Sequence, residues 1–239
     1  MTEQKRVAVM QPYFLPYIGY FALVANVDEF IIFDSVQYIR RGWQNRNRIR
    51  STDEPWSYIG VPVRKAEQSA LICDIEISYD EDWQGRVRKT IEALYSRAPY
   101  YAKILDVISP LWERTNLLRD LNFQLLQQIS SYLGYKPKWT FSSQKTLEHP
   151  GLREFRGQEL IQGICSISQA QIYYNPAGGT ALYDLAAFSK KGLVLRFIKP
   201  LLLDQIQREL PAMSDLSILD IAMYHSPAEI NRVIGKLST

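Results

Sequence analysis

Residues 7–34 read VAVMQPYFLPYIGYFALVANVDEFIIFD, and this stretch predicts the fold. It begins with an apolar run, residues 7–10, then turns at a segment rich in proline and tyrosine and continues with an apolar helical pattern. A second apolar run, residues 30–33, ends at Asp34. Two short apolar runs joined by a helical pattern are typical of a β-α-β unit. We therefore expect residues 7–10 and 30–33 to be adjacent parallel strands.

The rest of the chain alternates strand and helix signals. Strands are expected at residues 56–63, 71–77, 138–141, 171–173 and 193–197, and helices at 101–108, 155–166, 181–188, 215–221 and from Pro227 onward. This alternation favours a single α/β domain over residues 1–239, with a mainly parallel, Rossmann-like sheet. A helical insertion is expected at roughly residues 78–137.

Local signals mark the ends of two helices in that insertion. Ser78 followed by Glu81 resembles a capping box, and the helix it begins should run to about residue 97. Thr115 is the expected N-cap of a second helix with a leucine-rich face, and Gly134 is its expected C′ residue.

Composition narrows the class of protein. Charged residues make up 22% of the chain and the net charge is +3, which is too small to indicate a nucleic-acid binder by itself. The only cysteines, Cys73 and Cys165, lie far apart in apolar surroundings and fit a reduced intracellular protein. No stretch approaches the roughly 18 apolar residues of a membrane span. We therefore expect a cytoplasmic protein with no membrane span.

The first candidate site lies at the expected strand ends. Ligands of open parallel sheets bind beyond the carboxyl ends of the strands, which places Gln11 and Asp34 where chemistry is usual. The turn between them includes Tyr17 and Tyr20, spaced like the histidines of the His-x-Gly-His motif of nucleotidylyltransferases. A phosphate site is one interpretation of this turn. Ordinary packing of Gly19 and the two tyrosines is the other.

A basic segment forms the second candidate. Five arginines fall within residues 40–50, and no acidic residue lies among them. Guanidinium groups bind phosphate and carboxylate in a bidentate manner, so this loop fits an anionic substrate. The alternative is a solvated basic surface. The expected contacts within this segment are Trp43, Asn45, Arg46, Asn47 and Arg48.

Asp34 has three possible roles and one structural alternative. It could act as a general base, hold a metal or orient an arginine, and beside several arginines the orienting role is favoured. It could equally be a helix N-cap. We expect Asp34 to share a single cleft with Gln11, Gln37, Asn45, Arg46 and Arg48. Arg46 or Arg48 should be shielded there and hydrogen-bonded, with Asp34 as a candidate partner.

Other polar positions follow later strands. Ser142 and Ser143 come after one expected strand, and Asn175, Gly178 and Gly179 come after another. These residues are secondary candidates for substrate contact. The two histidines show no metal-binding spacing, so no metal site is expected.

Several long motifs carry a family resemblance. They are MQPYFLPYIGY (residues 10–20), FDSVQY (33–38), RRGWQNRNRI (40–49), WSYIGVPV (56–63), WTFSS (139–143), YNPAGG (174–179) and LSILD (216–220). With these motifs the chain resembles the WbqC-like proteins, which occur in bacterial clusters for O-antigen and other surface polysaccharides. The resemblance covers most of the chain.

The resemblance implies an enzyme of surface-polysaccharide or secondary-metabolite biosynthesis. Acyl or aminoacyl transfer to an amino sugar or a carrier-linked intermediate is the expected reaction, on an anionic substrate such as a nucleotide sugar. No cofactor can be named from the sequence. A nucleotidyl or adenylyl transferase is the first alternative. A non-catalytic module that binds nucleic acid or a carrier protein through the basic loop is the second.

Overall fold

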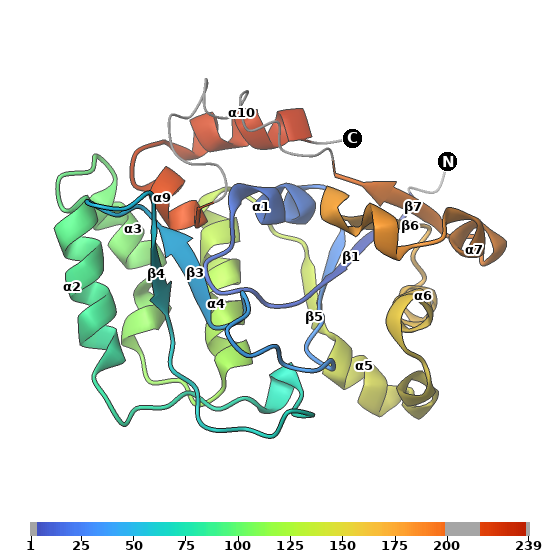
Figure 1. Ribbon diagram of the computed structural model, residues 1–239. Coiled ribbons are helices and arrows are strands. Elements are labelled where there is room, and N and C mark those ends of the chain that lie inside the picture. The colour runs from blue at the N-terminus through green and yellow to red at the C-terminus, as the bar shows by residue number, and fades with distance from the viewer. Residues whose placement is uncertain (1–3, 199–215, 238–239) are drawn as a thin grey trace.

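The computed structural model describes residues 4–198 and 216–237, and its centre is a parallel sheet (Figure 1). The strands are β1 (Arg6–Met10), β2 (Glu29–Ile32), β5 (Lys138–Phe141), β6 (Ile172–Asn175) and β7 (Val194–Phe197). Their order is β5-β2-β1-β6-β7, and every neighbouring pair is parallel. The predicted parallel pairing of the first two strands is confirmed, with Val7 opposite Glu29 and Met10 opposite Ile32. The chain therefore has an α/β, Rossmann-like fold.

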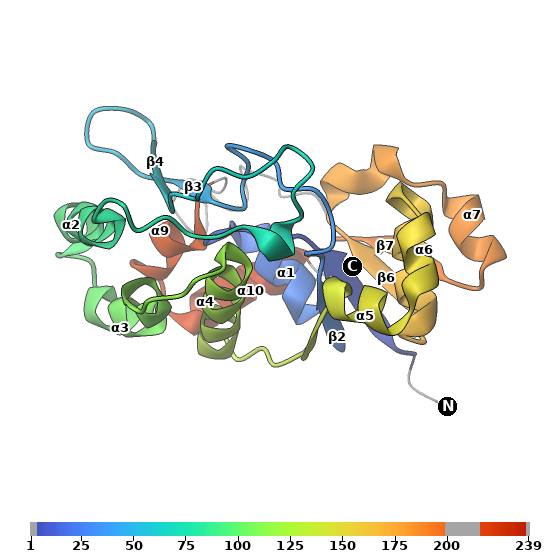
Figure 2. The same cartoon turned by 90° about the horizontal axis from the view of Figure 1, so that it is seen from below.

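Helices cover both faces of this sheet (Figures 1 and 2). The larger core includes Ala8 and Phe30 of the sheet and packs beneath α1 (Ile18–Ala25), α4 (Leu118–Tyr132), α9 (Ile218–Ala222) and α10 (Pro227–Leu237). The smaller core includes Val7, Val9 and Ile31 and packs beneath α6 (Gly157–Ile167) and α7 (Leu185–Lys190). Successive side chains of β1 thus point to opposite faces, as a strand with both faces covered requires.

The middle of the chain is helical, as predicted. It contains α2 (Trp83–Tyr95), α3 (Tyr101–Val107) and α4, and Gly134 ends α4 with a φ of +88°. Both predicted N-caps are wrong. Asp82 caps α2 by accepting a hydrogen bond from the backbone of Gly85, while the hydroxyl of Ser78 is bonded to Asp80. At α4 the N-cap position is residue 117, because residues 115–118 first bond back to residues 75–79.

The predicted strand at residues 71–77 is also wrong. This segment contains a short 3₁₀ helix, Ile72–Asp74, and its pairing within the described residues consists of isolated bridges with residues 37, 63 and 117. The segment crosses the surface between the three segments that contain residues 37, 63 and 117. Its apolar positions alternate because Ile75 and Ile77 point into the core.

The basic segment is not simply a loop. Residues Arg46–Ile49 form β3, which pairs antiparallel with β4 (Ser57–Gly60) in a hairpin outside the main sheet. The expected strand at 56–63 therefore exists in shorter form. Later in the chain, the expected helix at 181–188 is divided. Residues Ala177–Leu182 form a 3₁₀ helix, and Asp184 caps α7. The helix expected from 215 begins as α9, and residue 215 itself lies outside the described residues.

Candidate functional site

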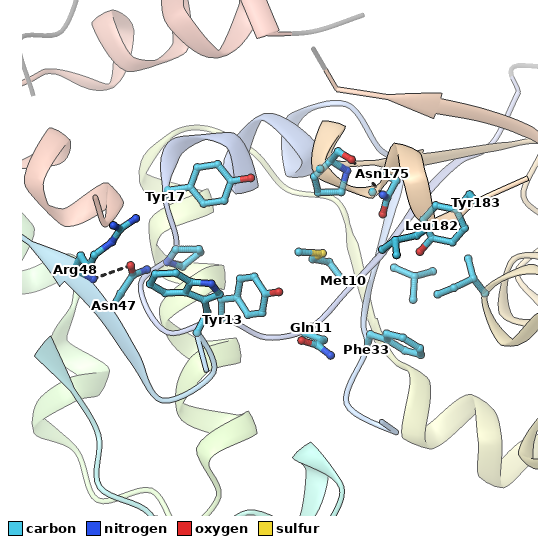
Figure 3. Close-up of a pocket in the computed structure, with 17 residues that line it drawn as sticks. Met10, Gln11, Tyr13, Tyr17, Phe33, Asn47, Arg48, Asn175, Leu182 and Tyr183 are labelled. Carbon is cyan, nitrogen blue, oxygen red and sulfur yellow. Dashed lines mark hydrogen bonds between the residues drawn. The ribbon is translucent and has the colours of Figure 1, made fainter. Parts of the chain in front are cut away.

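The strand order creates a crevice between β1 and β6. From β1 the chain adds β2 and β5 on one side, and it adds β6 and β7 on the other. In open α/β sheets, ligands bind at this switch point, beyond the carboxyl ends of the two diverging strands. A cavity of about 560 Å³ opens there (Figure 3), and we call it the switch-point cavity. It is lined by Val9, Met10, Gln11, Tyr13, Pro16, Tyr17, Phe33, Trp43, Asn47, Arg48, Ile161, Asn175, Pro176, Gly178, Gly179, Leu182 and Tyr183.

The turn after β1 forms one wall, and its backbone is strained. Leu15 has a φ of +42°, a region that residues other than glycine rarely adopt. The buried amide of Asn47 stabilises this conformation by donating to the carbonyl oxygens of Phe14 and Leu15 at 3.0 and 2.8 Å. The amide of Asn122 donates to the carbonyl of Pro12 at 2.8 Å. Buried amides from two other elements therefore fix the shape of the wall.

Arg48 lies at the same end of the cavity, beside Tyr17 and Asn47 (Figure 3). Its guanidinium carbon is 5.3 Å from the ring of Trp43 and 5.2 Å from the ring of Trp56. Cation–π contacts of this kind hold a guanidinium group in place while it keeps its charge. The hairpin thus places an arginine, held by two aromatic contacts, in the lining of the cavity.

The segment after β6 forms the facing wall (Figure 3). The side chain of Asn175 is buried and accepts a hydrogen bond from the hydroxyl of Tyr173 at 3.0 Å. Gly179 lies against that amide, because a Cβ at this position would be 1.8 Å from Nδ2 of Asn175. At Gly178 a Cβ would meet nothing within 4 Å. Only the second glycine is therefore required for packing.

Gln11 lies between the two walls, at the end of β1. Its side-chain oxygen accepts a hydrogen bond from Nε2 of Gln44 at 2.8 Å. This contact fixes the orientation of the amide and leaves Nε2 of Gln11 as its remaining donor. Gln11 therefore offers neutral hydrogen-bond donors at the strand end.

The ionisable groups of the cavity are unusual for an active site. Burial raises the pKa of Tyr13, with a further contribution from Tyr17, and burial also raises the pKa of Tyr17. Both hydroxyls are thus neutral at physiological pH. Among the described lining residues there is no carboxylate, thiol, imidazole or aliphatic hydroxyl. The cavity can bind, orient and donate hydrogen bonds, and its described walls supply no side chain for a covalent intermediate except tyrosine.

Many of the residues singled out from the sequence meet at this cavity. They are Gln11, Tyr17, Trp43, Asn47, Arg48, Asn175, Gly178 and Gly179. Tyr20 does not line it, because its buried hydroxyl donates to the carbonyl of Gln11 from the core side. Asn45 instead binds the carbonyl of Val61, and Arg46 stacks on the ring of Tyr58 at 4.0 Å.

Asp34 and the two serines form a separate group at the ends of β2 and β5. Asp34 is fully buried and accepts hydrogen bonds from both serine hydroxyls and from the backbone of Ser143, at 2.7–3.0 Å. Its ion-pair partner is Arg119 of α4 at 3.1 Å. The expected pairing with Arg46 or Arg48 is therefore wrong, as is the single cleft. Both carboxylate oxygens are occupied by donors, which fits the orienting role.

Gln37 lies in the loop beyond Asp34 and is exposed. Its amide donates to the carbonyl of Gln68 at 2.6 Å, and it too does not line the switch-point cavity. In residues 4–198 and 216–237, no three histidine, cysteine, aspartate or glutamate side chains gather where they could hold a metal ion.

Sequence reasoning missed several residues of this region. Tyr13 and Tyr183 line the cavity, and Trp56 stacks on Arg48 from the paired strand. Tyr13 was detectable, since it belongs to the same turn as Tyr17. Nothing in the sequence indicated Arg119, because it joins the sheet from a helix 85 residues beyond Asp34.

Comparisons with known proteins give the family. The model of the WbqC-like protein family matches residues 11–232. A protein of Mycobacterium tuberculosis (strain ATCC 25618 / H37Rv), named only as uncharacterized, is 42% identical over 134 residues, which cover 54% of this chain and 57% of that relative. No solved structure matches the chain. In the described residues, no helix is long and apolar enough to cross a membrane. The family match covers nearly the whole chain and includes both walls of the switch-point cavity, so the chain belongs to the WbqC-like protein family.

Proposed function

We propose that this protein is a group transferase that binds a nucleotide-linked or otherwise phosphorylated sugar in the switch-point cavity. The observation that carries the proposal is the position of Arg48, which contacts two indole rings and lines an aromatic cavity beyond β1 and β6. Such crevices bind phosphorylated ligands in many α/β enzymes, although fold alone does not give function.

The chemistry of the walls supports a ligand with both rings and an anionic group. Tyr13, Tyr17 and Trp43 offer aromatic surface with polar tips, as sugar and base rings require. Arg48 offers a cation that matches phosphate geometry. The volume of about 560 Å³ lies within the range of small-molecule sites.

Acyl or aminoacyl transfer to an amino group is the reaction that fits these walls best. The amine of the sugar would attack the carbonyl carbon of the donor, forming a C–N bond. The donor's bond to its leaving group would break, and the amine proton would leave with that group. Such a reaction needs alignment and stabilisation of the oxyanion rather than a protein nucleophile. Gln11 and Asn175 are the candidate hydrogen-bond donors to that oxyanion, one from each strand end.

Two other functions are weaker. Nucleotidyl transfer would use Tyr17 and Tyr20 together, but only Tyr17 reaches the cavity. A nucleic-acid binder would spread its arginines over an open face. Here Arg50 is instead paired with the buried Asp220, at 2.6 Å, and Arg48 lines a cavity.

The test is a ligand screen followed by a search for product. Thermal shift with nucleotide sugars, ATP and acyl-coenzyme A identifies the ligand class, because a ligand at 100 times its Kd stabilises the protein by about 2.7 kcal/mol. Incubating the best nucleotide amino sugar with acyl donors, followed by mass spectrometry, should then show one added acyl or aminoacyl group. Stabilisation by nucleic acid alone, with none by any sugar nucleotide, would contradict the proposal. We also propose that the protein acts in the cytoplasm, because it would meet such substrates there.

A further inference from the structure

A second cavity lies beside the first along the same edge of the sheet. Its volume is about 830 Å³, and it lies where β2 and β5 end. The two cavities share their boundary elements. In the segment after β2, Phe33 lines the first cavity and Ser35 lines the second. In α6, Ile161 lines the first cavity and its neighbour Leu160 lines the second. Because its polar wall is rich in arginine, we call it the arginine cavity.

One arginine of this cavity is rigidly placed. Arg119 donates to Asp34 at 3.1 Å and to Asp120 at 2.9 Å, and it stacks over the ring of Phe141. Nε and Nη1 of its guanidinium are used in these bonds. The edge that carries Nη2 is therefore the part of the group that remains for a ligand.

Two further arginines come from the segment before α6. Arg156 donates through Nη1 to the backbone carbonyls of Arg153 and Phe155, which fixes its guanidinium near the chain. Neither Arg153 nor Arg156 takes part in an ion pair within the described part of the chain. Asp74 is the only carboxylate among the described lining residues. The lining therefore contains two arginines that form no ion pair within the described residues, Arg153 and Arg156. It also contains Arg119, which is already paired, and one acid, Asp74.

The rest of the lining combines apolar side chains with four neutral polar ones, Ser35, Gln37, Ser143 and Thr146. Leu147, Leu152, Phe155 and Leu160 contribute to its walls. The thiol of Cys73 also lines it, but burial raises its pKa to about 12, so it stays protonated. A protonated thiol is a poor nucleophile. The lining therefore offers a ligand three things: guanidinium groups, neutral hydrogen-bonding side chains and apolar surface.

We propose that the arginine cavity binds a second substrate, one with an anionic head group, phosphate or carboxylate, and an apolar body. This inference rests on the proposed function, because a transferase needs two substrates held side by side. The head group would meet Arg119, Arg153 and Arg156, and the body would lie on the leucine side chains. Residues 33–35 and 160–161 separate the two cavities, so this ligand would lie next to the sugar site.

Binding of hexyl phosphate by isothermal titration calorimetry tests the proposal, because this probe carries both chemical features. The double variant Arg153→Ala/Arg156→Ala should weaken binding by tenfold or more. Arg88→Ala removes an exposed arginine of α2, which stacks on Trp112 outside this cavity, and should leave binding unchanged. Hexanoate in place of the phosphate distinguishes the two head groups, since the preferred one binds more tightly. Melting temperatures equal to wild type would show that the variants are folded.

A reciprocal variant separates this inference from the proposed function. Arg48→Ala should leave the affinity for hexyl phosphate unchanged, since Arg48 lines only the switch-point cavity. If hexyl phosphate binds and depends on Arg153 and Arg156 while no nucleotide sugar binds, this inference stands and the proposed function falls. If binding depends on Arg48 instead, or if wild type shows none at millimolar concentrations, the inference is overturned.

Discussion

Replacing Asp34 with asparagine should destabilise the fold strongly, because this carboxylate holds three elements together. It is 0% exposed and accepts four hydrogen bonds, from the hydroxyl of Ser142, the hydroxyl and backbone of Ser143, and Arg119. Asparagine keeps one acceptor oxygen and turns an NH₂ group toward the other donors. About two of the four bonds are then lost.

The magnitude follows from the number and kind of bonds. Each hydrogen bond to a charged group contributes about 1.5–3 kcal/mol. Arg119 keeps its second partner, Asp120, so it is not left as an unpaired buried charge. We expect a loss of about 3–5 kcal/mol, as for other broken buried pairs. For a chain of this size, that lowers the Tm by roughly 6–20 °C.

Urea unfolding followed by circular dichroism measures this effect. Asp53→Asn is the matched control, because Asp53 is exposed and its carboxylate accepts a hydrogen bond from the hydroxyl of its neighbour Thr52. It should change the free energy of unfolding by no more than about 0.5 kcal/mol. If Asp34→Asn unfolds like wild type but no longer binds or turns over substrate, the orienting role is refuted. Asp34 would then contact substrate.

Three further predictions concern the packing at Gly179, the ion pair of Asp220 with Arg50, and the pH dependence that Glu29 contributes. Gly179→Ala should weaken sugar-nucleotide binding because its Cβ takes the space of the neighbouring amide, whereas Gly178→Ala, which meets nothing, should bind like wild type in the same titration. Asp220→Asn should destabilise the protein by about 3–5 kcal/mol in urea unfolding, since the partly buried Arg50 would lose its partner. Burial acts to raise the pKa of Glu29, but hydrogen bonds from lysine and threonine neighbours lower it overall. Glu29 therefore stabilises the folded protein above its unfolded pKa. This stabilisation is lost as the pH falls through the lower pKa of the folded state. Glu29→Gln should therefore flatten the fall in Tm below about pH 5, and an unchanged acid profile would contradict this.

The fold was largely predictable because its signals are local. Two apolar runs separated by a helical pattern were enough to place β1 beside β2. Gly134 identified the end of α4 because the left-handed conformation there favours glycine. The cap at Ser78 failed because its hydroxyl donates to Asp80 and its backbone N–H bonds to Pro62. The cap at Thr115 failed because residues 115–118 bond to residues 75–79, a contact between segments that a local motif does not reveal.

Many residues singled out from the sequence line the switch-point cavity, but their expected grouping with Asp34 was wrong. The hairpin follows β2 in sequence, which made Asp34 and Arg48 plausible neighbours. In the structure the chain after Asp34 instead returns to the turn after β1, where Phe14 donates to the carbonyl of Trp43 at 2.9 Å. Arg48 is therefore placed at the β1 end. Asp34 is left with β5 and Arg119, a contact that only tertiary packing creates.

The central claim is that Arg48 holds the anionic group of the ligand in the switch-point cavity. Its most direct test is calorimetric titration of wild type, Arg48→Ala and Arg88→Ala with the nucleotide sugar that stabilises wild type most. Loss of a hydrogen-bonded charge contact costs about 1.5–3 kcal/mol, so Arg48→Ala should bind at least about tenfold more weakly. Arg88→Ala, whose arginine stacks on Trp112 away from the cavity, should match wild type. Equal affinity of all three proteins, or equal loss in both variants, would contradict the account.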